Sequence, residues 1–339
     1  MKALRLLLLP FGLLYGIITT LRNFLFDSGI FASYVIPGKS ICVGNLNVGG
    51  SGKSPMTRYL MQHFQKNYRM QILSRGYGRS TKGHILVQAE HSASKVGDEP
   101  LQYFLDAAEN DEVHVSENRK MAIATMDRSE NHLLLLDDAF QHRKVKAGLS
   151  ILLSEFNDPF FRDYILPVGN LREGRRGAKR AHILVFTKCP EELTEEMKKP
   201  YLTCAKKWNI PSFFSRIVYQ PLRAVTATVA ENPEHILLVT GIANPTHLLV
   251  HLQQTYRVTH LRYTDHFNFT SEKIDEIHRK FDTFEQQKTA IVTTEKDFMR
   301  LIHSPLQAQI SSYPWYVQPI GISIDREEEF LQIVHQYVR

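Results

Sequence analysis

The stretch VGNLNVGGSGKSP, residues 43–55, constrains the fold of this 339-residue chain more than any other feature. It follows a short apolar run at 40–46 and leads into a helical pattern at 56–64, which is the setting of a phosphate-binding P-loop. In such a loop the backbone N–H groups and the N-terminus of the following helix converge on phosphate oxygens. Asn47 stands where the usual pattern has its first glycine, so the glycines are shifted along the loop rather than lost. The stretch predicts a nucleotide site in an α/β fold.

The residues of this loop have distinct expected roles. Glycines let the backbone approach the phosphates closely, while Lys53 would reach the β- and γ-phosphates and the Ser54 hydroxyl would bind Mg²⁺. The segment FTKCP, residues 186–190, lacks the aspartate that a guanine-specific site needs, so we expect ATP. A glycine turn before an ordinary helix is the alternative. The predicted nucleotide-binding set in the loop is Asn47, Val48, Gly49, Gly50, Ser51, Gly52, Lys53 and Ser54.

Two adjacent acids end the apolar run HLLLLDD, residues 132–138. Carboxylates at the tip of a buried strand are unfavourable unless they are paired or bind a metal. The second half of a P-loop site is a carboxylate that holds the metal. We therefore predict that Asp137 and Asp138 bind Mg²⁺, and the following AFQH places His142 at the same edge. A solvated strand end is the alternative.

Two further acidic motifs offer a base for the hydroxyl group that would accept a phosphate. VGDEP, residues 96–100, places Asp98 and Glu99 at the start of a predicted helix, and YTDHFNFT, residues 263–270, places His266 just before another. Phosphoryl transfer to a hydroxyl needs a base to take its proton. Asp98 is either that base or a helix N-cap. If the two halves of the chain face each other, Asp98 and His266 could meet.

A basic segment and the overall charge favour an anionic partner. The net charge is +6, and residues 169–180 contain five arginines and lysines, among them Arg172. A solvated charge run is the ordinary interpretation. The segment has no interleaved aromatic residues for base stacking, which argues against nucleic acid. A phosphorylated lipid headgroup suits arginine through its two-pronged hydrogen bonding.

The N-terminus is unusually apolar from residue 4 to residue 26. The uninterrupted part between Arg5 and Arg22 is 16 residues long, which is short of the ~20 that span a bilayer comfortably. The run is not followed by a small-x-small cleavage site, which argues against a secretory signal. A buried core helix is the other alternative. We expect a helix in the membrane interface.

The rest of the chain alternates apolar runs with helical patterns, in an ordinary globular composition of 43% hydrophobic and 22% charged residues. This predicts an α/β protein: a P-loop core with a mostly parallel sheet, and a smaller α/β second domain on a two-stranded linker formed by 212–221 and 315–324. The expected domains are 1–35, 36–215 with the returning helix 326–339, and 216–325. The expected strands are 40–46, 70–75, 84–89, 112–116, 132–138, 150–155, 182–188, 212–221, 235–241, 260–266, 289–295 and 315–324.

These motifs together carry a resemblance to a known family. The chain resembles the tetraacyldisaccharide 4'-kinases, or lipid A 4'-kinases, over nearly its whole length and with the motifs in the same order. Several of the motifs, notably DDAFQH and SRGYGR, are more specific than a P-loop alone. Gly174 stands where the family usually has a proline. The motifs are GNLNVGGSGKSP, SRGYGR, GDEP, LDDAFQH, GNLREG, VTGIANP, TDHF and TTEKD.

The resemblance implies an ATP- and Mg²⁺-dependent kinase on the cytoplasmic face of a Gram-negative inner membrane. It would transfer the γ-phosphate of ATP to the 4'-hydroxyl of a tetraacylated glucosamine disaccharide 1-phosphate, giving lipid IVA. Its partners would be this lipid and the membrane surface, without nucleic acid, and we expect a monomer. Motif matching implies Asp98 as base, assisted by His266. The residues implied to bind phosphate or metal are Lys53, Ser54, Glu99, Asp137, Asp138, His142 and Arg172.

Two other functions remain open from the residues alone. The chain could be a membrane-associated P-loop ATPase or switch that binds a protein partner. Such a protein would not need Asp98 and His266 to take a proton from an acceptor hydroxyl. It could also be a basic membrane-binding scaffold with a vestigial nucleotide loop. The paired acids Asp137 and Asp138 argue against the scaffold, because a vestigial site has no use for them.

Overall fold

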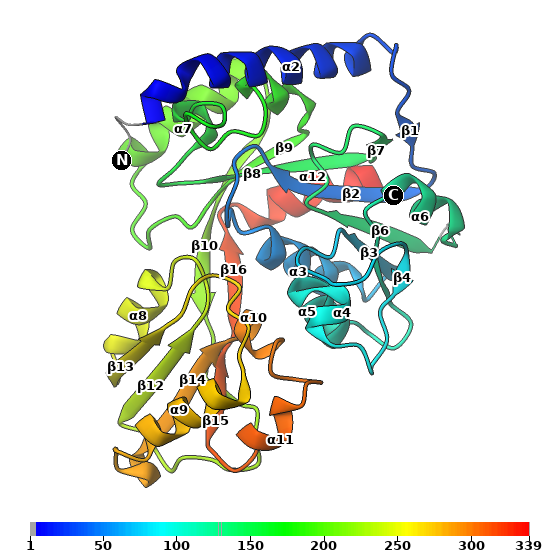
Figure 1. Ribbon diagram of the computed structural model, residues 1–339. Coiled ribbons are helices and arrows are strands. Elements are labelled where there is room, and N and C mark those ends of the chain that lie inside the picture. Colours follow the sequence, from blue (N-terminus) through cyan, green and yellow to red (C-terminus); the bar gives the residue numbers. More distant parts are fainter. Residues whose placement is uncertain (1–4, 128, 130, 339) are drawn as a thin grey trace.

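A computed structural model describes residues 5–127, 129 and 131–338, and it contains two large sheets (Figure 1). The larger sheet has nine strands in the described part of the chain, in the order β16-β10-β9-β8-β2-β6-β3-β5-β4. All its neighbouring pairs are parallel except β4–β5 and β10–β16. Its strands are β2 (Lys39–Asn45), β3 (Arg69–Ser74), β4 (Ile85–Leu86), β5 (Glu112–Val115), β6 (His132–Asp137), β8 (Leu149–Glu155), β9 (Ile183–Thr187), β10 (Ser212–Tyr219) and β16 (Ile320–Ile324).

The register of the central strands places the functional loops at one edge. Every residue of β6 is buried, as expected for a parallel strand covered on both faces. Val43 of β2 lies opposite Asp137 at the end of β6, so the loops that follow β2 and β6 leave the sheet side by side. Ligands of open α/β sheets bind at this carboxyl edge.

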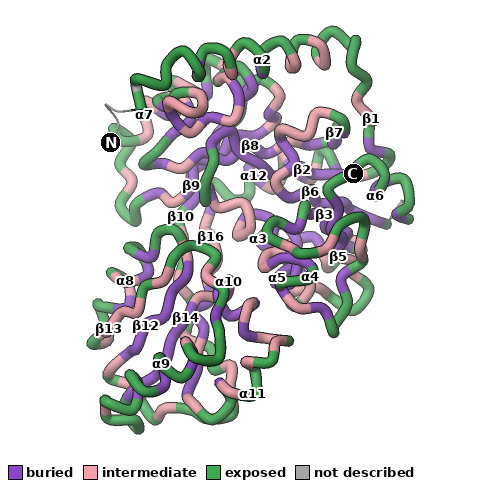
Figure 2. The backbone as a smooth tube through the Cα atoms, viewed as in Figure 1, coloured by how far each residue is buried: buried purple, intermediate pink, exposed green. Residues whose placement is uncertain are grey.

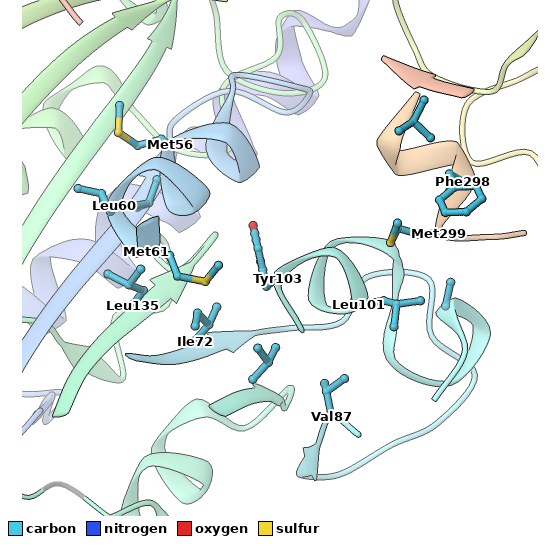
Figure 3. Close-up of a cluster of buried hydrophobic side chains, with 14 of the residues drawn as sticks. Met56, Leu60, Met61, Ile72, Val87, Leu101, Tyr103, Leu135, Phe298 and Met299 are labelled. Atoms are coloured by element: carbon cyan, nitrogen blue, oxygen red, sulfur yellow. The ribbon is translucent and has the colours of Figure 1, made fainter. Parts of the chain in front are cut away.

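Helices cover both faces of this sheet (Figure 1). The first of them after the glycine loop, α3 (Lys53–Phe64), buries an apolar stripe that includes Met56, Leu60 and Met61 (Figure 3). The other elements of this part are α4 (Ala93–Val96), α5 (Asp98–Asp106), α6 (Arg119–Thr125), η2 (Phe160–Arg162), η3 (Arg175–Arg180), α7 (Glu195–Trp208) and α12 (Glu327–Val338), with a two-stranded sheet of β1 (Tyr34–Val35) and β7 (Val145–Lys146).

The smaller sheet has five strands in the described residues, in the order β11-β15-β14-β12-β13, and all but the β11–β15 pair are parallel. Its strands are β11 (Arg223–Ala224), β12 (His235–Thr240), β13 (Arg257–Arg262), β14 (Thr289–Thr294) and β15 (Trp315–Gln318). Its helices are α8 (Thr246–Gln253), α9 (Ser271–Phe281), η4 (Gln286–Lys288), α10 (Glu295–Phe298) and α11 (Leu306–Ile310). The predicted mixed α/β fold with mostly parallel sheets is therefore confirmed.

The two-stranded linker is confirmed, but its second strand is shorter than predicted. β10 and β16 pair antiparallel from Ser215 opposite Ile324 to Tyr219 opposite Ile320. The sequence predicted one strand over 315–324, whereas Pro319 separates β15 in the smaller sheet from β16 in the linker. Proline has no N–H to continue a ladder.

Two other predicted strands differ from the structure. The run 84–89 forms only β4, two residues long, because β4 is an edge strand that pairs with β5 alone. The strand predicted at 260–266 is β13, which starts at Arg257, opposite His235 of β12, and ends at Arg262. The residues that follow it form the turn that carries His266, which has a positive φ of 56°.

The N-terminal helix lies along the outside of the larger sheet's domain (Figures 1 and 2). After a turn η1 (Leu6–Leu8), helix α2 (Leu9–Asp27) buries only Gly12 and Thr19. Gly12 lets α2 pack closely against Val168, because a Cβ at this position would lie only 2.8 Å from the Val168 side chain. Among the described residues, α2 is the one helix long and apolar enough to cross a membrane. Its exposure contradicts the alternative of a buried core helix.

The last helix packs against the P-loop helix. Phe330 of α12 is fully buried, and its ring lies 5.4 Å from that of Phe213 and 6.2 Å from that of Tyr59 on α3. We propose to divide the chain accordingly into an N-terminal segment, 1–35, a first domain, 36–215 with α12, and a second domain, 216–325.

Removing the Phe330 side chain is expected to destabilise the first domain. Truncating a fully buried phenylalanine to alanine costs about 3–5 kcal/mol of unfolding free energy, and Phe330→Ala should do so because it leaves a cavity where the ring packs against Tyr59 and Phe213. Urea denaturation followed by circular dichroism measures the change. Gln332→Ala, at an exposed position of the same helix, is the control. Equal stability of the two variants would contradict the packing role of α12.

Candidate active site

Asn47 anchors the glycine loop to a neighbouring loop. Its side-chain amide donates to Asp163 Oδ2 at 2.8 Å, and its backbone forms a bridge with Leu171. The N–H of Val48 donates to the carbonyl of Asn170 at 2.7 Å. Asn47, which replaces the usual first glycine, therefore holds the glycine loop against residues 163–171. These residues directly precede Arg172 in the chain.

The glycines of the loop adopt backbone angles that other residues rarely take. Gly49 has a φ of 112°, and Gly52, immediately before α3, has a φ of 82°. The Lys53 ammonium lies 3.4 Å from the carbonyl of Gly49 and 3.4 Å from the side-chain oxygen of Asn45. Lys53 thus folds back over the loop, and in a P-loop the lysine at this position reaches the phosphates.

Asp137 lies buried at the end of β6 with an unsatisfied oxygen. Its Oδ2 accepts a hydrogen bond from Ser74 at 3.1 Å, while its Oδ1 is buried and has no hydrogen-bond partner in the described part of the chain. Burial, together with the negative charges of Glu99 and Asp138, raises the pKa of Asp137 to about 7. The charge of Lys53 offsets this rise only in part, and a bound cation would supply further positive charge.

Asp138 lies between cationic side chains. Arg172 Nη1 binds both of its carboxylate oxygens, at 3.0 and 3.1 Å, and the Lys53 ammonium lies 3.8 Å away. Burial opposes ionisation, but Lys53 and Arg172 lower the pKa of Asp138 below its ordinary value. The buried Arg119, which sequence reasoning missed, donates to the carbonyls of Asp137 and Asp138 at 2.8 and 3.0 Å and fixes this turn.

The structure joins the glycine loop to the second acidic motif. The Ser54 hydroxyl donates to Glu99 Oε1 at 2.8 Å. No group of three or more histidine, cysteine, aspartate or glutamate side chains could hold a metal among the residues that the structure describes. Mg²⁺ usually takes only one or two carboxylates and completes its shell with water and phosphates. The Ser54 hydroxyl, Glu99 and the unpartnered Asp137 Oδ1 fit that donor set.

His142 does not join these carboxylates. Its Nε2 is buried without a hydrogen-bond partner among the described residues. Burial and then the charges of Arg119 and Lys144 lower its pKa to about 4, so the ring is neutral. The nearby cations disfavour a metal at this ring, so its predicted role as a metal ligand receives no support from the geometry.

The predicted meeting of Asp98 and His266 is observed. Asp98 Oδ2 lies 3.2 Å from His266 Nδ1, although 168 residues separate them in the chain. Arg300, which sequence reasoning missed, donates to the same oxygen from Nε at 2.9 Å and Nη2 at 2.6 Å. Burial opposes ionisation of Asp98, but the hydrogen bonds with His266 and Arg300 and the charge of Arg300 lower its pKa. The pair combines an ionised carboxylate with an imidazole that is partly exposed.

Two glycines allow the loop SRGYGR to approach this pair. Gly76 and Gly97 have φ values of 69° and 99°, and a Cβ on Gly97 would lie 3.2 Å from the backbone of Gly76 and Tyr77. The exposed ring of Tyr77 lies 5.5 Å from that of His266. An aromatic face therefore stands beside the Asp98–His266 pair.

The loop that carries Arg172 is bonded to the N-terminal helix. The Tyr15 hydroxyl of α2 donates to the carbonyl of Arg172 at 2.9 Å, and Asn23 donates to Glu173. Glu173 is fully buried and pairs with Arg180 at 2.6 Å. The sequence indicated a basic run and the family motif GNLREG with Arg172, but neither gave a sign that Glu173 is buried.

Comparison with known proteins gives one family. A model of the family described as Tetraacyldisaccharide-1-P 4'-kinase matches residues 4–339. The chain is 40% identical to the tetraacyldisaccharide 4'-kinase of Flavobacterium psychrophilum, across 100% of this chain and 98% of that protein. It is 38% identical to the tetraacyldisaccharide 4'-kinase of Cytophaga hutchinsonii, across 97% of this chain and 94% of that protein.

A solved structure also resembles this one over its whole length. It is the crystal structure of LpxK from Aquifex aeolicus in complex with ATP, and the TM-score is 0.75 at 27% sequence identity. The match covers 99% of this chain and 100% of that chain. The similarity therefore includes both sheets and the linker between them.

Proposed function

The chain belongs to the tetraacyldisaccharide-1-P 4'-kinase family, and from that premise we propose how its site transfers the γ-phosphate of ATP to the 4'-hydroxyl of a tetraacyldisaccharide 1-phosphate. The product is lipid IVA, an intermediate of lipid A biosynthesis. The enzyme is thus an ATP-dependent kinase whose acceptor is an alcohol group.

The glycine loop binds the triphosphate of ATP. Its backbone N–H groups and the N-terminus of α3 face the phosphate oxygens, and Lys53 neutralises charge on the β- and γ-phosphates. Ser54, Glu99 and Asp137 would hold Mg²⁺, which would supply positive charge to neutralise the phosphates during transfer. Arg172, held by Asp138, offers its remaining N–H groups to the phosphates.

Asp98 and His266 act on the acceptor. The Asp98 carboxylate takes the proton of the 4'-hydroxyl. At the same time the hydroxyl oxygen forms a bond to the γ-phosphorus, and the bond between that phosphorus and the β-γ bridging oxygen breaks. ADP leaves with that oxygen, and His266 orients the carboxylate through the 3.2 Å contact with Oδ2.

One observation carries this assignment: the proposed base, Asp98, and the acid that binds the Ser54 hydroxyl, Glu99, are consecutive residues. Asp98 contacts His266 while Glu99 accepts from Ser54, so the start of α5 joins the two halves of the reaction. A nucleotide-dependent switch has no need of a base and imidazole next to its phosphate loop. The arrangement therefore favours transfer to an alcohol over hydrolysis alone.

Incubation with γ-labelled ATP and detergent-dispersed disaccharide 1-phosphate tests the proposal. The label is expected in the lipid, in equal amount to the ADP formed, and only when Mg²⁺ is supplied. Label that appears solely as inorganic phosphate would support the ATPase or switch instead. The same reaction with GTP is expected to be slower, since the chain lacks a guanine-specific motif.

We infer that α2 attaches the enzyme to the cytoplasmic face of the inner membrane, where its lipid acceptor and ATP meet. Large apolar side chains of α2, among them Leu13, Ile17 and Leu21, are more than half exposed. These three lie four residues apart on one helix face. We propose that a single copy suffices, because Asp98 of the first domain and His266 of the second already meet within one chain.

Replacing Leu13, Ile17 and Leu21 together by serine is expected to release the enzyme from vesicles. Each apolar side chain that enters the interface contributes about 1 kcal/mol or more, so the partition coefficient should fall about 100-fold. Sedimentation with vesicles of acidic phospholipid measures the change. Leu202→Ser, at an exposed position of α7, is the control. Unchanged sedimentation of the triple variant would refute the attachment through α2.

A further inference from the structure

The segment from Glu295 to Arg300, part of the motif TTEKD and the turn after it, has no role in the scheme above. It begins with α10 at the end of β14 in the second domain. Thr294 caps α10 by accepting from the N–H of Asp297 at 3.0 Å. Three of its charged side chains, Glu295, Lys296 and Arg300, pair with residues of the first domain.

The first of these pairs reaches the P-loop helix. Arg58 of α3 binds Glu295 through two hydrogen bonds, Nη1 to Oε2 at 2.7 Å and Nη2 to Oε1 at 3.1 Å, and it also pairs with Asp106 of α5. Arg58 lies one turn after Ser54, on the same face of the helix. The side chains of Arg58 and Glu295 are 11% and 6% exposed, so the pair is shielded from water and its loss leaves a buried charge.

The other two pairs reach the two acids at the start of α5. Arg300 binds Asp98, and Lys296 lies 3.6 Å from Glu99. Arg300 is itself fixed, because its Nη1 pairs with Asp297 at 2.9 Å. The buried carboxylate of Asp297 in turn accepts from the N–H of Gly241 at 3.0 Å. The position of Asp98 is thus set by a chain of contacts that starts in the second domain.

An apolar contact lies between these ion pairs. Phe298 and Met299 are buried, and both belong to the same core cluster as Leu101 and Tyr103 of α5. In Figure 3, Met299 lies between Phe298 and the helix that carries Leu101. The segment therefore joins the two domains by packing as well as by charge.

We propose that residues 295–300 form an interdomain clamp that positions the acceptor base relative to the nucleotide loop. Glu295 and Arg300 are positioning residues: Glu295 holds the second domain to the P-loop helix through Arg58, and Arg300 aims the Asp98 carboxylate. The inference rests on the proposed role of Asp98 as the base. A misplacement of about 1 Å far from the chemistry can lower turnover about 100-fold.

Substitutions of Arg300 test the clamp, because they should lower kcat without weakening nucleotide binding. Arg300→Met should lower kcat about 100-fold, and the affinity for a fluorescent ATP analogue should stay within about twofold. Arg300→Lys keeps the charge and should recover most of the turnover. In an Asp98→Asn background, Arg300→Met should add little, since its effect passes through Asp98. Arg257→Met, at an exposed position of β13, is the control.

A distance measurement tests the clamp without activity. Nitroxide labels at Lys66→Cys and Gln287→Cys, both exposed and one in each domain, report on the domain arrangement in a Cys204→Ser background. Glu295→Gln should broaden the distance distribution and move it to longer distances, whereas Arg257→Met should not.

The possible failures are distinguishable. Full turnover of Asp98→Asn would refute the proposed base and leave the distance test of the clamp standing. An inactive Asp98→Asn variant, combined with wild-type turnover of Arg300→Met and an unchanged distance distribution in Glu295→Gln, would refute the clamp alone. Parallel loss of kcat, ATP-analogue affinity and thermal stability in Arg300→Met and Arg300→Lys alike would also refute it, since that is the signature of a general structural role.

Discussion

Asp98→Asn is expected to lower kcat about 10²–10⁴-fold, the usual contribution of a positioned general base. Asparagine has the same shape as aspartate but cannot take a proton from the 4'-hydroxyl. The affinity for an ATP analogue should stay within about twofold, because Asp98 contacts His266 and Arg300 rather than the glycine loop. Steady-state kinetics with the lipid acceptor, together with titration of the fluorescent analogue, measures both quantities.

Asp265→Asn provides the matched control for this variant. Asp265 precedes His266 and is exposed, and its carboxylate accepts from the N–H of His266 at 3.1 Å without contacting Asp98. We expect this variant to keep turnover within about threefold of the wild type, since a local contact of an exposed side chain contributes little. Wild-type turnover of Asp98→Asn would show that another group takes the proton.

Lys53→Ala is expected to abolish most of the activity by a different route. Removing one preorganised charge that stabilises a transition state costs about 10²–10³-fold in kcat, and Lys53 is the P-loop lysine. The ATP analogue should also bind more weakly, which distinguishes this variant from Asp98→Asn. The loss of a cation 3.8 Å from Asp138 should leave Arg172 as the main partner of that carboxylate.

Lys66→Ala is the control for Lys53→Ala. Lys66 is exposed and follows α3 in the chain, at the opposite end of that helix from the glycine loop. Its removal changes the net charge equally but leaves the phosphate site intact. Similar kinetics for Lys53→Ala and wild type would mean that the loop does not bind the transferred phosphate.

Much of the fold could be predicted because its signals are local. The glycine loop between an apolar strand and an amphipathic helix indicated the P-loop, and the apolar run before Asp137 indicated a strand buried on both faces. The similar segments 212–221 and 315–324 indicated the linker. The predicted strand bounds were wrong where a strand is interrupted and at the edge of a sheet. Pro319 divides one predicted strand, and β4 has a partner on one side only.

The site was harder to predict because its contacts join distant parts of the chain. Asp98 and Arg300 are 202 residues apart, and the buried pair of Arg58 and Glu295 spans 237 residues. Arg58 and Arg300 look like ordinary surface residues in the sequence. The meeting of Asp98 with His266 could be anticipated only because both belong to motifs just before or at the start of a helix.

Identification of the phosphorylated position in the lipid product tests the proposed reaction most directly. Proton–phosphorus correlation spectra of the product from wild-type enzyme, ATP and disaccharide 1-phosphate should show a new phosphomonoester coupled to the proton at the 4' carbon. The amount of this ester should equal the ADP formed, and the Asp98→Asn variant should form little of either. A new phosphate on any other hydroxyl, or ADP and inorganic phosphate with unmodified lipid, would contradict the proposed function.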